Sequence, residues 1–185
     1  ESCKKISYLF PRAHAVAYVM MAFRIAWFKV YHPLAFYAAY FSIRAKAFDL
    51  RIMTGDLKTQ LTEFNRIKAL DRAASPKDKD LMSALEVSME MYQRGYRFIN
   101  VDIQHSEARR FSIKDGALLP PFLAIDSLGE TVADAIVEER NERPFTSLKD
   151  LQRRCKVSNT IIDLMKELKC CGELPEDEQM SLFGA

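Results

Sequence analysis

The sequence of 185 residues predicts a mainly α-helical fold that contains one small β-hairpin. Three observations support this fold class. Long segments within the first 95 residues are rich in helix-forming residues and lack internal Gly and Pro. Alternation of apolar and polar residues, which is typical of strands, is confined to residues 96–119. Beyond Pro120-Pro121, short helical segments alternate with loops.

The first helix is predicted over residues 13–31, between Pro11 at its start and Pro33, which opens the next helix. Ser75 and Pro76 have the order of an N-cap and a first helical turn, so they begin another helix. The three further helices expected before residue 95 cover residues 34–47, 56–73 and 75–92.

The segment 13–31 is apolar enough to be weighed as a membrane span. Arg24, Lys29 and His14 interrupt it, however, and each charge at mid-bilayer costs about 2.5–3.5 kcal/mol. We therefore expect a buried core helix and no membrane partner.

The pattern changes after residue 95, where we expect a domain boundary. Residues 98–103 alternate, and residues 110–113 and 117–119 flank the turn signal Lys114-Asp115-Gly116. A small β-hairpin is therefore expected in this region. The last helices are predicted over residues 130–140, 147–154 and 158–170.

Charge and cysteine usage restrict the class of protein. Positive charge is concentrated in the first 60 residues, which suits phosphate groups, whereas the last 30 residues are acidic. The cysteines have no C-x-x-C spacing, so we expect reduced structural thiols and no metal site. They are Cys3, Cys155, Cys170 and Cys171.

The start of the sequence has neither an initiator Met nor a secretory signal, as expected of a fragment of a cytoplasmic protein.

Residues 122–137 have a helix-hairpin-helix pattern: an apolar segment, a short turn with Gly129, and a helix with Ala133 and Ile136 facing inward. Such a hairpin presents the N–H groups of a helix N-terminus to a DNA phosphate without reading the base sequence. Ser127, Leu128 and Gly129 are the candidate DNA contacts.

The first turn of this motif usually has Gly where this chain has Ser127. A positive φ at Ser127 would carry strain of about 1 kcal/mol and weaken phosphate binding. An ordinary pair of helices joined by a turn is the alternative interpretation. Residues 143–151 and 157–168 predict a second, degenerate copy of the same unit, which makes the arrangement a tandem one.

The end of the sequence contains a short peptide motif. Residues 179–183 read Gln179-Met180-Ser181-Leu182-Phe183, and Gln-x-Ser-Leu-Phe is typical of peptides that bind a sliding clamp. In such docking, Leu182 and Phe183 would enter an apolar groove while the Gln179 amide fixes the register. The alternative is a frayed chain end without a partner.

A possible nucleotide site lies at the start of the first helix. His14 and Tyr18 are four residues apart and hence on one face, with Arg12 at the helix N-terminus. A cation, an imidazole and an aromatic ring can hold a triphosphate and stack on a base. The alternative is an ordinary core helix with one satisfied His and one half-buried Tyr.

The order of these motifs resembles one family from end to end. The segment at 10–14, Phe-Pro-Arg-Ala-His, precedes an Ala-rich aromatic helix and Phe-Lys-Val-Tyr-His-Pro at 28–33; a hairpin, the helix-hairpin-helix and the terminal Gln-x-Ser-Leu-Phe follow. This order resembles the C-terminal part of the PolC-type alpha subunit of bacterial DNA polymerase III. The terminal motif favours this type over other bacterial replicative alpha subunits.

The resemblance implies three parts. Residues 1–95 would be the C-terminal part of the polymerase fingers, with Arg12, His14 and Tyr18 beside the incoming dNTP, although Arg12 stands where Lys is more common. Residues 96–172 would be a duplex-DNA-binding domain in which Thr131 lies close to the same phosphate as Ser127. Residues 173–185 would be a flexible tail that binds the sliding clamp.

The resemblance also implies what this chain lacks. The family joins dNTPs to a primer with two Mg²⁺ ions held by acidic residues of a palm. We expect neither a palm, nor catalytic or metal-binding residues, nor the family's 3′–5′ exonuclease in this fragment. It is therefore expected to be inactive alone and to work with primer-template DNA and other replisome subunits in the bacterial cytoplasm. The alternative is a stand-alone, non-enzymatic helix-hairpin-helix module that binds DNA or adapts a clamp.

Overall fold

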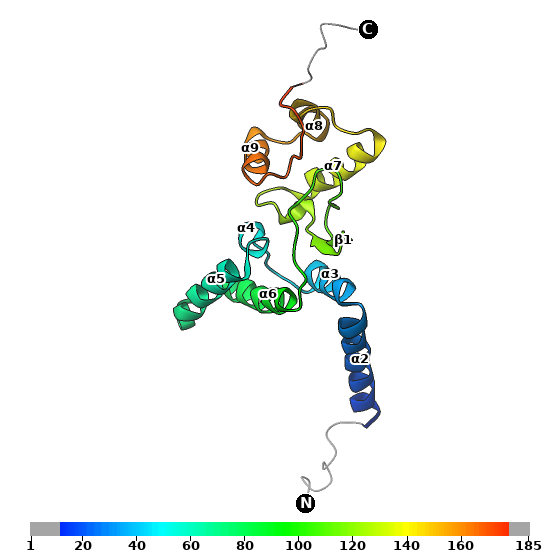
Figure 1. The fold of residues 1–185 in the computed structure, drawn as a ribbon, viewed down its shortest axis with the longest axis vertical. Coiled ribbons are helices and arrows are strands. Elements are labelled where there is room, and N and C mark those ends of the chain that lie inside the picture. Colours follow the sequence, from blue (N-terminus) through cyan, green and yellow to red (C-terminus); the bar gives the residue numbers. More distant parts are fainter. Residues whose placement is uncertain (1–11, 178–185) are drawn as a thin grey trace, which may run out of the picture.

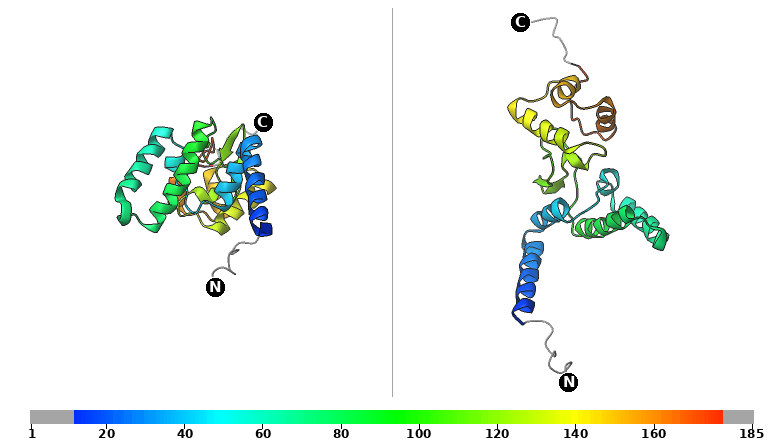
Figure 2. Two further views of the ribbon diagram at one scale, coloured as in Figure 1. Left: turned by 90° about the horizontal axis from the view of Figure 1, so that it is seen from below. Right: turned by 180° about the vertical axis from the view of Figure 1, so that it is seen from behind.

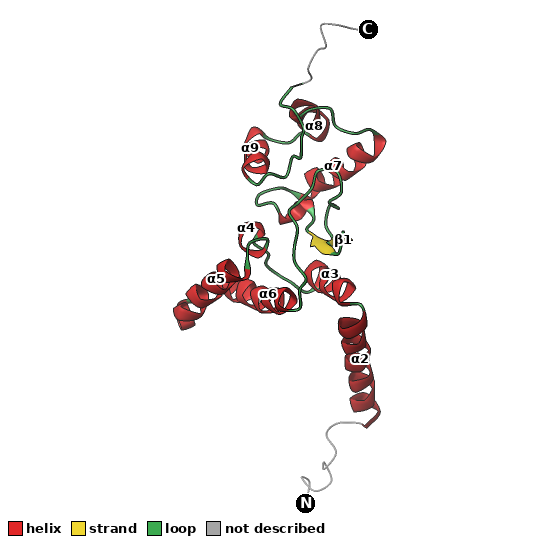
Figure 3. Ribbon diagram, viewed as in Figure 1, coloured by secondary structure: helices red, strands yellow, loops and turns green. Residues whose placement is uncertain are grey.

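The computed structural model describes residues 12–177, and within them the chain is mainly helical with one two-stranded antiparallel hairpin, as the sequence predicts (Figures 1 and 3). The first helices are α2 (Arg12–Tyr31), α3 (Pro33–Ile43), α4 (Leu50–Met53), α5 (Leu57–Leu70) and α6 (Pro76–Gln93). Strands β1 (Ser112–Lys114) and β2 (Ala117–Leu119) precede α7 (Glu130–Glu142), α8 (Leu148–Cys155) and α9 (Asn159–Glu167). Short 3-10 helices are η1 (Asp71–Ala73) and η2 (Phe122–Ala124).

Polar caps fix where most of these helices begin. The Ser75 hydroxyl accepts a hydrogen bond from the Asp78 amide at 3.1 Å, and the Asp78 carboxylate accepts one from the Ser75 amide at 3.1 Å. This reciprocal capping box starts α6 at Pro76, where the sequence predicts it. The side chains that cap α4, α5, α8 and α9 are Asp49, Asp56, Ser147 and Ser158.

One expectation for residues 34–53 is wrong, and one short helix in this stretch was not predicted. The second helix ends at Ile43 rather than 47, because the amides of Arg44 and Ala45 both bond to the Tyr40 carbonyl and close its last turn. The chain then turns so that Phe48 packs inward. The four-residue helix α4 follows, started by the Asp49 carboxylate, which accepts a bond from the Ile52 amide at 3.0 Å.

The alternating segment 98–103 is not a strand. Phe98 forms one isolated parallel bridge with Leu118 of β2, and no ladder follows it. The side chains of Asn100 and Asp102 explain this difference, because each bonds to a nearby backbone amide: Asn100 to Val101 at 2.9 Å, and Asp102 to Gln104 at 2.7 Å. The hairpin itself pairs β1 with β2 around Asp115-Gly116, as predicted.

Two hydrophobic clusters hold the molecule together. The first joins α3, α5 and α6 to the hairpin, and its fully buried side chains include Tyr37, Met53, Ile67, Leu85 and Leu118. The second lies among η2, α7, α8 and α9, and includes Phe122, Ile136, Leu151, Met165 and Cys170. In Figures 1 and 2 the hairpin lies between these two groups of helices.

The short helix α4 contacts both clusters. Leu50 packs in the second cluster, whereas Met53 is buried in the first. Between them, the Arg51 guanidinium forms an ion pair at 2.9 Å with Glu167 at the end of α9. The partly buried ring of Phe48, just before α4, packs against both clusters as well.

Helix α2 has apolar side chains on most sides, interrupted by Arg24 and Lys29, but is not buried by the described residues. Figure 1 and the right-hand view of Figure 2 show it extending away from the rest of the molecule. It packs against α3, and its C-terminal end is tied to α6 by the Lys29–Glu90 ion pair at 2.6 Å. Phe23 is 72% exposed and Trp27 49% exposed. The expectation that this helix is buried in the core is therefore wrong within residues 12–177. Among these residues, no helix is long and apolar enough to cross a membrane.

Candidate nucleic-acid interface

The first hairpin joins η2 to α7 through Ser127, Leu128 and Gly129. Ser127 has φ 64°, so this Ser occupies the left-handed conformation that the motif usually gives to Gly. The side chain of Leu128 is 6% exposed and anchors the hairpin in the second cluster. Gly129 is the N-cap of α7. The turn is thus kept despite the Ser, at the cost of strain on the order of 1 kcal/mol.

Nothing in the described chain requires glycine at position 129. Its backbone has φ −75° and ψ 155°, which any residue adopts, and an added Cβ would meet no atom within 4 Å. The first amides of α7, those of Glu130 and Thr131, have no acceptor within their own helix. Glycine at 129 therefore leaves these N–H groups uncovered toward solvent, where an anion can approach them.

A second hairpin, between α8 and α9, repeats the first position by position. Lys156 has φ 53° and corresponds to Ser127. Val157, 3% exposed, corresponds to Leu128, and Ser158 is the N-cap that corresponds to Gly129. Both hairpins therefore have a left-handed residue, a buried apolar anchor and an N-cap. Sequence reasoning recognised the second unit but missed Lys156, which an alignment of residues 127–131 with 156–160 would have found.

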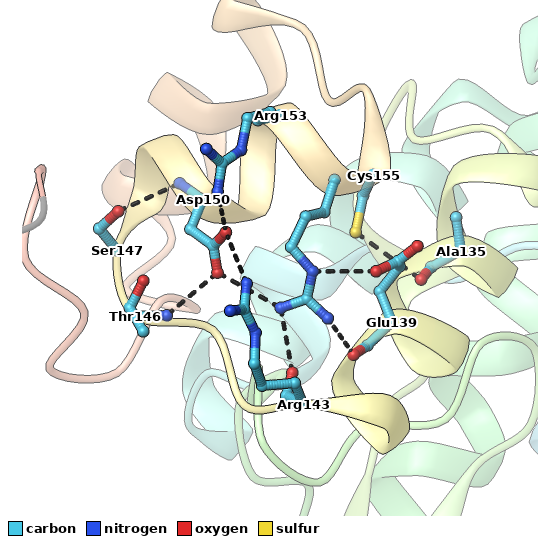
Figure 4. A network of polar contacts seen from close by, with 9 residues as sticks. Ala135, Glu139, Arg143, Thr146, Ser147, Asp150, Arg153 and Cys155 are labelled. Atoms are coloured by element: carbon cyan, nitrogen blue, oxygen red, sulfur yellow. Dashed lines mark hydrogen bonds and ion pairs between the residues drawn. The ribbon is translucent and has the colours of Figure 1, made fainter.

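Helix α8 is positioned by a buried carboxylate (Figure 4). The Asp150 side chain is fully buried, and it accepts hydrogen bonds from Arg153 at 2.9 Å and from Arg154 and the Thr146 amide at 3.3 Å each. Burial alone would raise the pKa of Asp150, but these donors hold it below its usual value. Arg154 also bonds to Glu139 of α7 at 2.9 Å, which locks α7 and α8 together.

The start of α8 is closed by the chain itself. The amides of Leu148 and Lys149 donate to the carbonyls of Pro175 and Glu176 at 2.9 and 3.2 Å. The Lys149 ammonium pairs with Asp177, and Lys166 of α9 pairs with Glu176 at 2.7 Å. Because these amides already have acceptors, the N-terminus of α8 is not open to an anion as that of α7 is.

The buried thiols have no place in this interface. Burial raises the pKa of Cys155 and of Cys170 to about 12, and that of Cys171 is also raised, so all three remain protonated and unreactive near neutral pH. Within residues 12–177, no group of three or more His, Cys, Asp or Glu side chains is placed to hold a metal ion.

The other predicted sites are described only in part. The rings of His14 and Tyr18 meet edge to face with centroids 4.4 Å apart, and Tyr18 is 62% exposed. The structure therefore brings these two side chains together, whereas the side chain of Arg12 lies outside the described part. The predicted clamp-binding residues, Gln179, Met180, Ser181, Leu182 and Phe183, also lie outside the described residues.

The fold and the paired hairpins define the second half of the chain as a helix-hairpin-helix unit, and residues 95–179 match the family model described as "Helix-hairpin-helix motif". DNA polymerase III PolC-type of Caldanaerobacter subterraneus subsp. tengcongensis is 48% identical over 183 residues. The proteins of the same name from Streptococcus pyogenes serotype M12 and Streptococcus suis are 47% and 48% identical over 186 and 185 residues.

Each alignment covers 99% of this chain but 13% of the relative's length. The chain thus corresponds to one segment of PolC-type DNA polymerase III, and the predicted resemblance is confirmed.

Proposed function

We propose that this chain is a part of a replicative DNA polymerase and that its two hairpins bind the sugar-phosphate backbone of duplex primer-template DNA. The repeated hairpin conformation is the observation that carries the proposal. Two left-handed turns, each anchored by a buried apolar residue, present two helix N-termini, and such termini bind phosphates without reading bases. Ser127, Leu128, Gly129 and Thr131 make up the first site.

The proposed contact depends on counterion release. Each phosphate neutralised by the protein frees condensed cations, so affinity for duplex DNA falls with salt whatever the base sequence. Removing one hairpin contact should lower the affinity for duplex DNA of any sequence. It should also reduce the slope of log affinity against log salt concentration by roughly one.

Gly129→Asp tests the first hairpin. Asp is a good N-cap and an added Cβ has room, so the fold is kept while a negative charge is placed at the phosphate site. Ser83→Asp, on the exposed face of α6, is the control with the same charge change. Duplex binding by fluorescence anisotropy should weaken at least about tenfold more in Gly129→Asp than in the control, as expected when a charge-assisted contact of about 1.5–3 kcal/mol is lost. Equal weakening would contradict the hairpin's role.

Ser158→Asp applies the same test to the second hairpin. In the present chain the Ser158 hydroxyl accepts a hydrogen bond from the Ile161 amide at 3.3 Å, and the Asp carboxylate can accept the same bond. We expect a similar loss of duplex affinity. Wild-type affinity in this variant would restrict DNA binding to the first hairpin.

The remaining functions follow the family. We propose that residues 1–95 belong to the fingers, that Arg12, His14 and Tyr18 contact the incoming dNTP, and that synthesis with Mg²⁺ occurs on a palm outside this chain. The intact polymerase would act in the bacterial cytoplasm with other replisome subunits. The purified chain should incorporate no nucleotide in a primer-extension assay, and template-dependent incorporation would refute this.

Clamp binding by residues 179–183 is proposed from the sequence motif. The test is binding of the chain to a purified bacterial sliding clamp, compared with Leu182→Ala/Phe183→Ala and with Gly184→Ala as a control outside the motif. Loss in the double variant alone supports the proposal, whereas equal binding by all three chains contradicts it.

A stand-alone DNA-binding or clamp-adaptor module is the competing function. The exposed apolar surface of α2 argues against it, since a patch of large apolar side chains facing solvent marks a surface that other polypeptide covers. The part of the relatives' length that this chain does not match is long enough to provide that cover.

A further inference from the structure

Acidic side chains stand next to the first hairpin, where a DNA phosphate is proposed to bind. Glu130 is the first residue of α7, and Asp134 lies one turn further along the same face. Carboxylates at a helix N-terminus are attracted to the same positive dipole end and free amides that a phosphate would use. Left alone, these two charges would compete with the phosphate and repel it.

One guanidinium engages both carboxylates. Arg109 donates from Nε to Asp134 at 3.1 Å and from a terminal nitrogen to the other oxygen of the same carboxylate, a bidentate arrangement. Its remaining nitrogen donates to Glu130. Hydrogen bonding to Arg109 lowers the pKa of Asp134, so the pair remains ionised on both sides.

The backbone places Arg109 beside the hairpin. The loop that carries it is bonded to η2, the segment that leads into the hairpin: the Phe122 amide donates to the Glu107 carbonyl at 2.9 Å, and the Leu123 amide to the Ala108 carbonyl at 3.1 Å. On the other side, the Phe111 amide donates to the Ser42 hydroxyl at 2.9 Å. Arg109 is therefore held next to α7 by its chain neighbours and not only by its own ion pairs.

We propose that Arg109 is a positioning residue for duplex binding, which holds Glu130 and Asp134 away from the phosphate and neutralises them. This inference rests on the proposed function of the first hairpin. The Arg109 side chain is 48% exposed and that of Glu130 is 65% exposed, so these ion pairs add little to the stability of the fold. Their main effect is on the electrostatic potential at the first hairpin.

The test is a set of charge-matched variants. Arg109→Gln removes the cation, and Arg110→Gln is the control because it makes the same charge change at the next, also exposed, residue. Duplex affinity at low salt should fall by about twofold to fivefold more in Arg109→Gln than in Arg110→Gln, as expected for a charge near a helix terminus. An equal or larger loss in Arg110→Gln overturns the proposal.

A background without the two carboxylates gives the decisive comparison. In Glu130→Gln/Asp134→Asn, adding Arg109→Gln should cost no more affinity than adding Arg110→Gln, since nothing remains for Arg109 to neutralise. A structural role of Arg109 would not be rescued by removing its partners. If the excess loss persists in this background, Arg109 binds DNA itself and the proposal is wrong.

The Gly129→Asp variant separates this inference from the proposed function. Weak binding by Gly129→Asp together with no excess loss in Arg109→Gln would overturn the role of Arg109 alone. If Gly129→Asp binds as well as its control, the hairpin does not hold phosphate, and the role of Arg109 falls with it.

Discussion

The Asp150 carboxylate and the Arg154 guanidinium form an ion pair at 3.3 Å in which the Asp side chain is fully buried and the Arg side chain 11% exposed. Replacing the carboxylate by an amide keeps the shape of the side chain. The Arg154 guanidinium or the Thr146 amide, which both donate to Asp150, would then face an NH₂ group that is itself a donor. We expect Asp150→Asn to lower the free energy of unfolding by about 2–4 kcal/mol in urea titrations. Asp177→Asn, at an exposed pair with Lys149, should cost less than about 1 kcal/mol.

Acid should remove the same contribution. The pKa of Asp150 is lower in the folded chain than in an unfolded one, where it is near 3.9, so the folded state binds fewer protons. Its stabilisation is therefore complete well above pH 4 and is lost as pH falls below 4 toward the folded pKa. The gap in unfolding free energy between wild type and Asp150→Asn should narrow between pH 7 and pH 3. A constant gap would show that the carboxylate is not stabilised by its ionisation.

The strained turn at Ser127 should respond to side-chain shape. Ser127→Val places a β-branched residue at φ 64° and should lower the free energy of unfolding by about 1–3 kcal/mol. Ser127→Gly relieves strain but adds entropy to the unfolded chain, so its stability should remain within about 1 kcal/mol of wild type. Ser83→Val on exposed α6 controls for the Val side chain. Calorimetry that ranks the Val variant equal to its control would contradict strain at this turn.

A buried polar pair joins α5 to α6. The Ser88 hydroxyl donates to the Gln60 side-chain carbonyl at 2.6 Å, and both residues are fully buried. Ser88→Ala and Gln60→Leu should each cost about 1–3 kcal/mol of unfolding free energy, because each leaves the other partner unsatisfied. The double variant should lose less than the sum of the two. Additive losses would show that the two side chains act independently.

The sequence predicts those elements whose signals are local. Ser75-Pro76 determined the start of α6, and Asp115-Gly116 determined the hairpin turn, because a cap or a positive φ is satisfied within a few residues. Helix α4 was missed since four residues have no measurable periodicity, although Asp49 was a usable cap signal. The alternation at 98–103 misled because side-chain-to-backbone bonds compete with pairing there.

The candidate site was predictable in composition but not in its electrostatics. The spacing around Gly129 indicated a phosphate-binding hairpin, and the left-handed Ser127 was foreseen as a condition of that turn. Arg109 could not be found in this way, because it lies 21 residues before Glu130 and meets it only through the packing of its loop on η2. The exposure of α2 was equally hidden, since composition indicates that a helix prefers burial but not which polypeptide supplies it.

Helix α4 has a mechanical consequence. Leu50 at its start is buried in the second cluster, and Met53 at its end is buried in the first cluster. Between them, Arg51 forms an ion pair with Glu167 at the end of α9. Because Leu50 and Met53 of the same helical turn are buried in different clusters, any movement of the hairpins relative to the α5–α6 pair would pull one of these side chains out of its cluster, so α4 couples the two halves together with Phe48 and the β-hairpin.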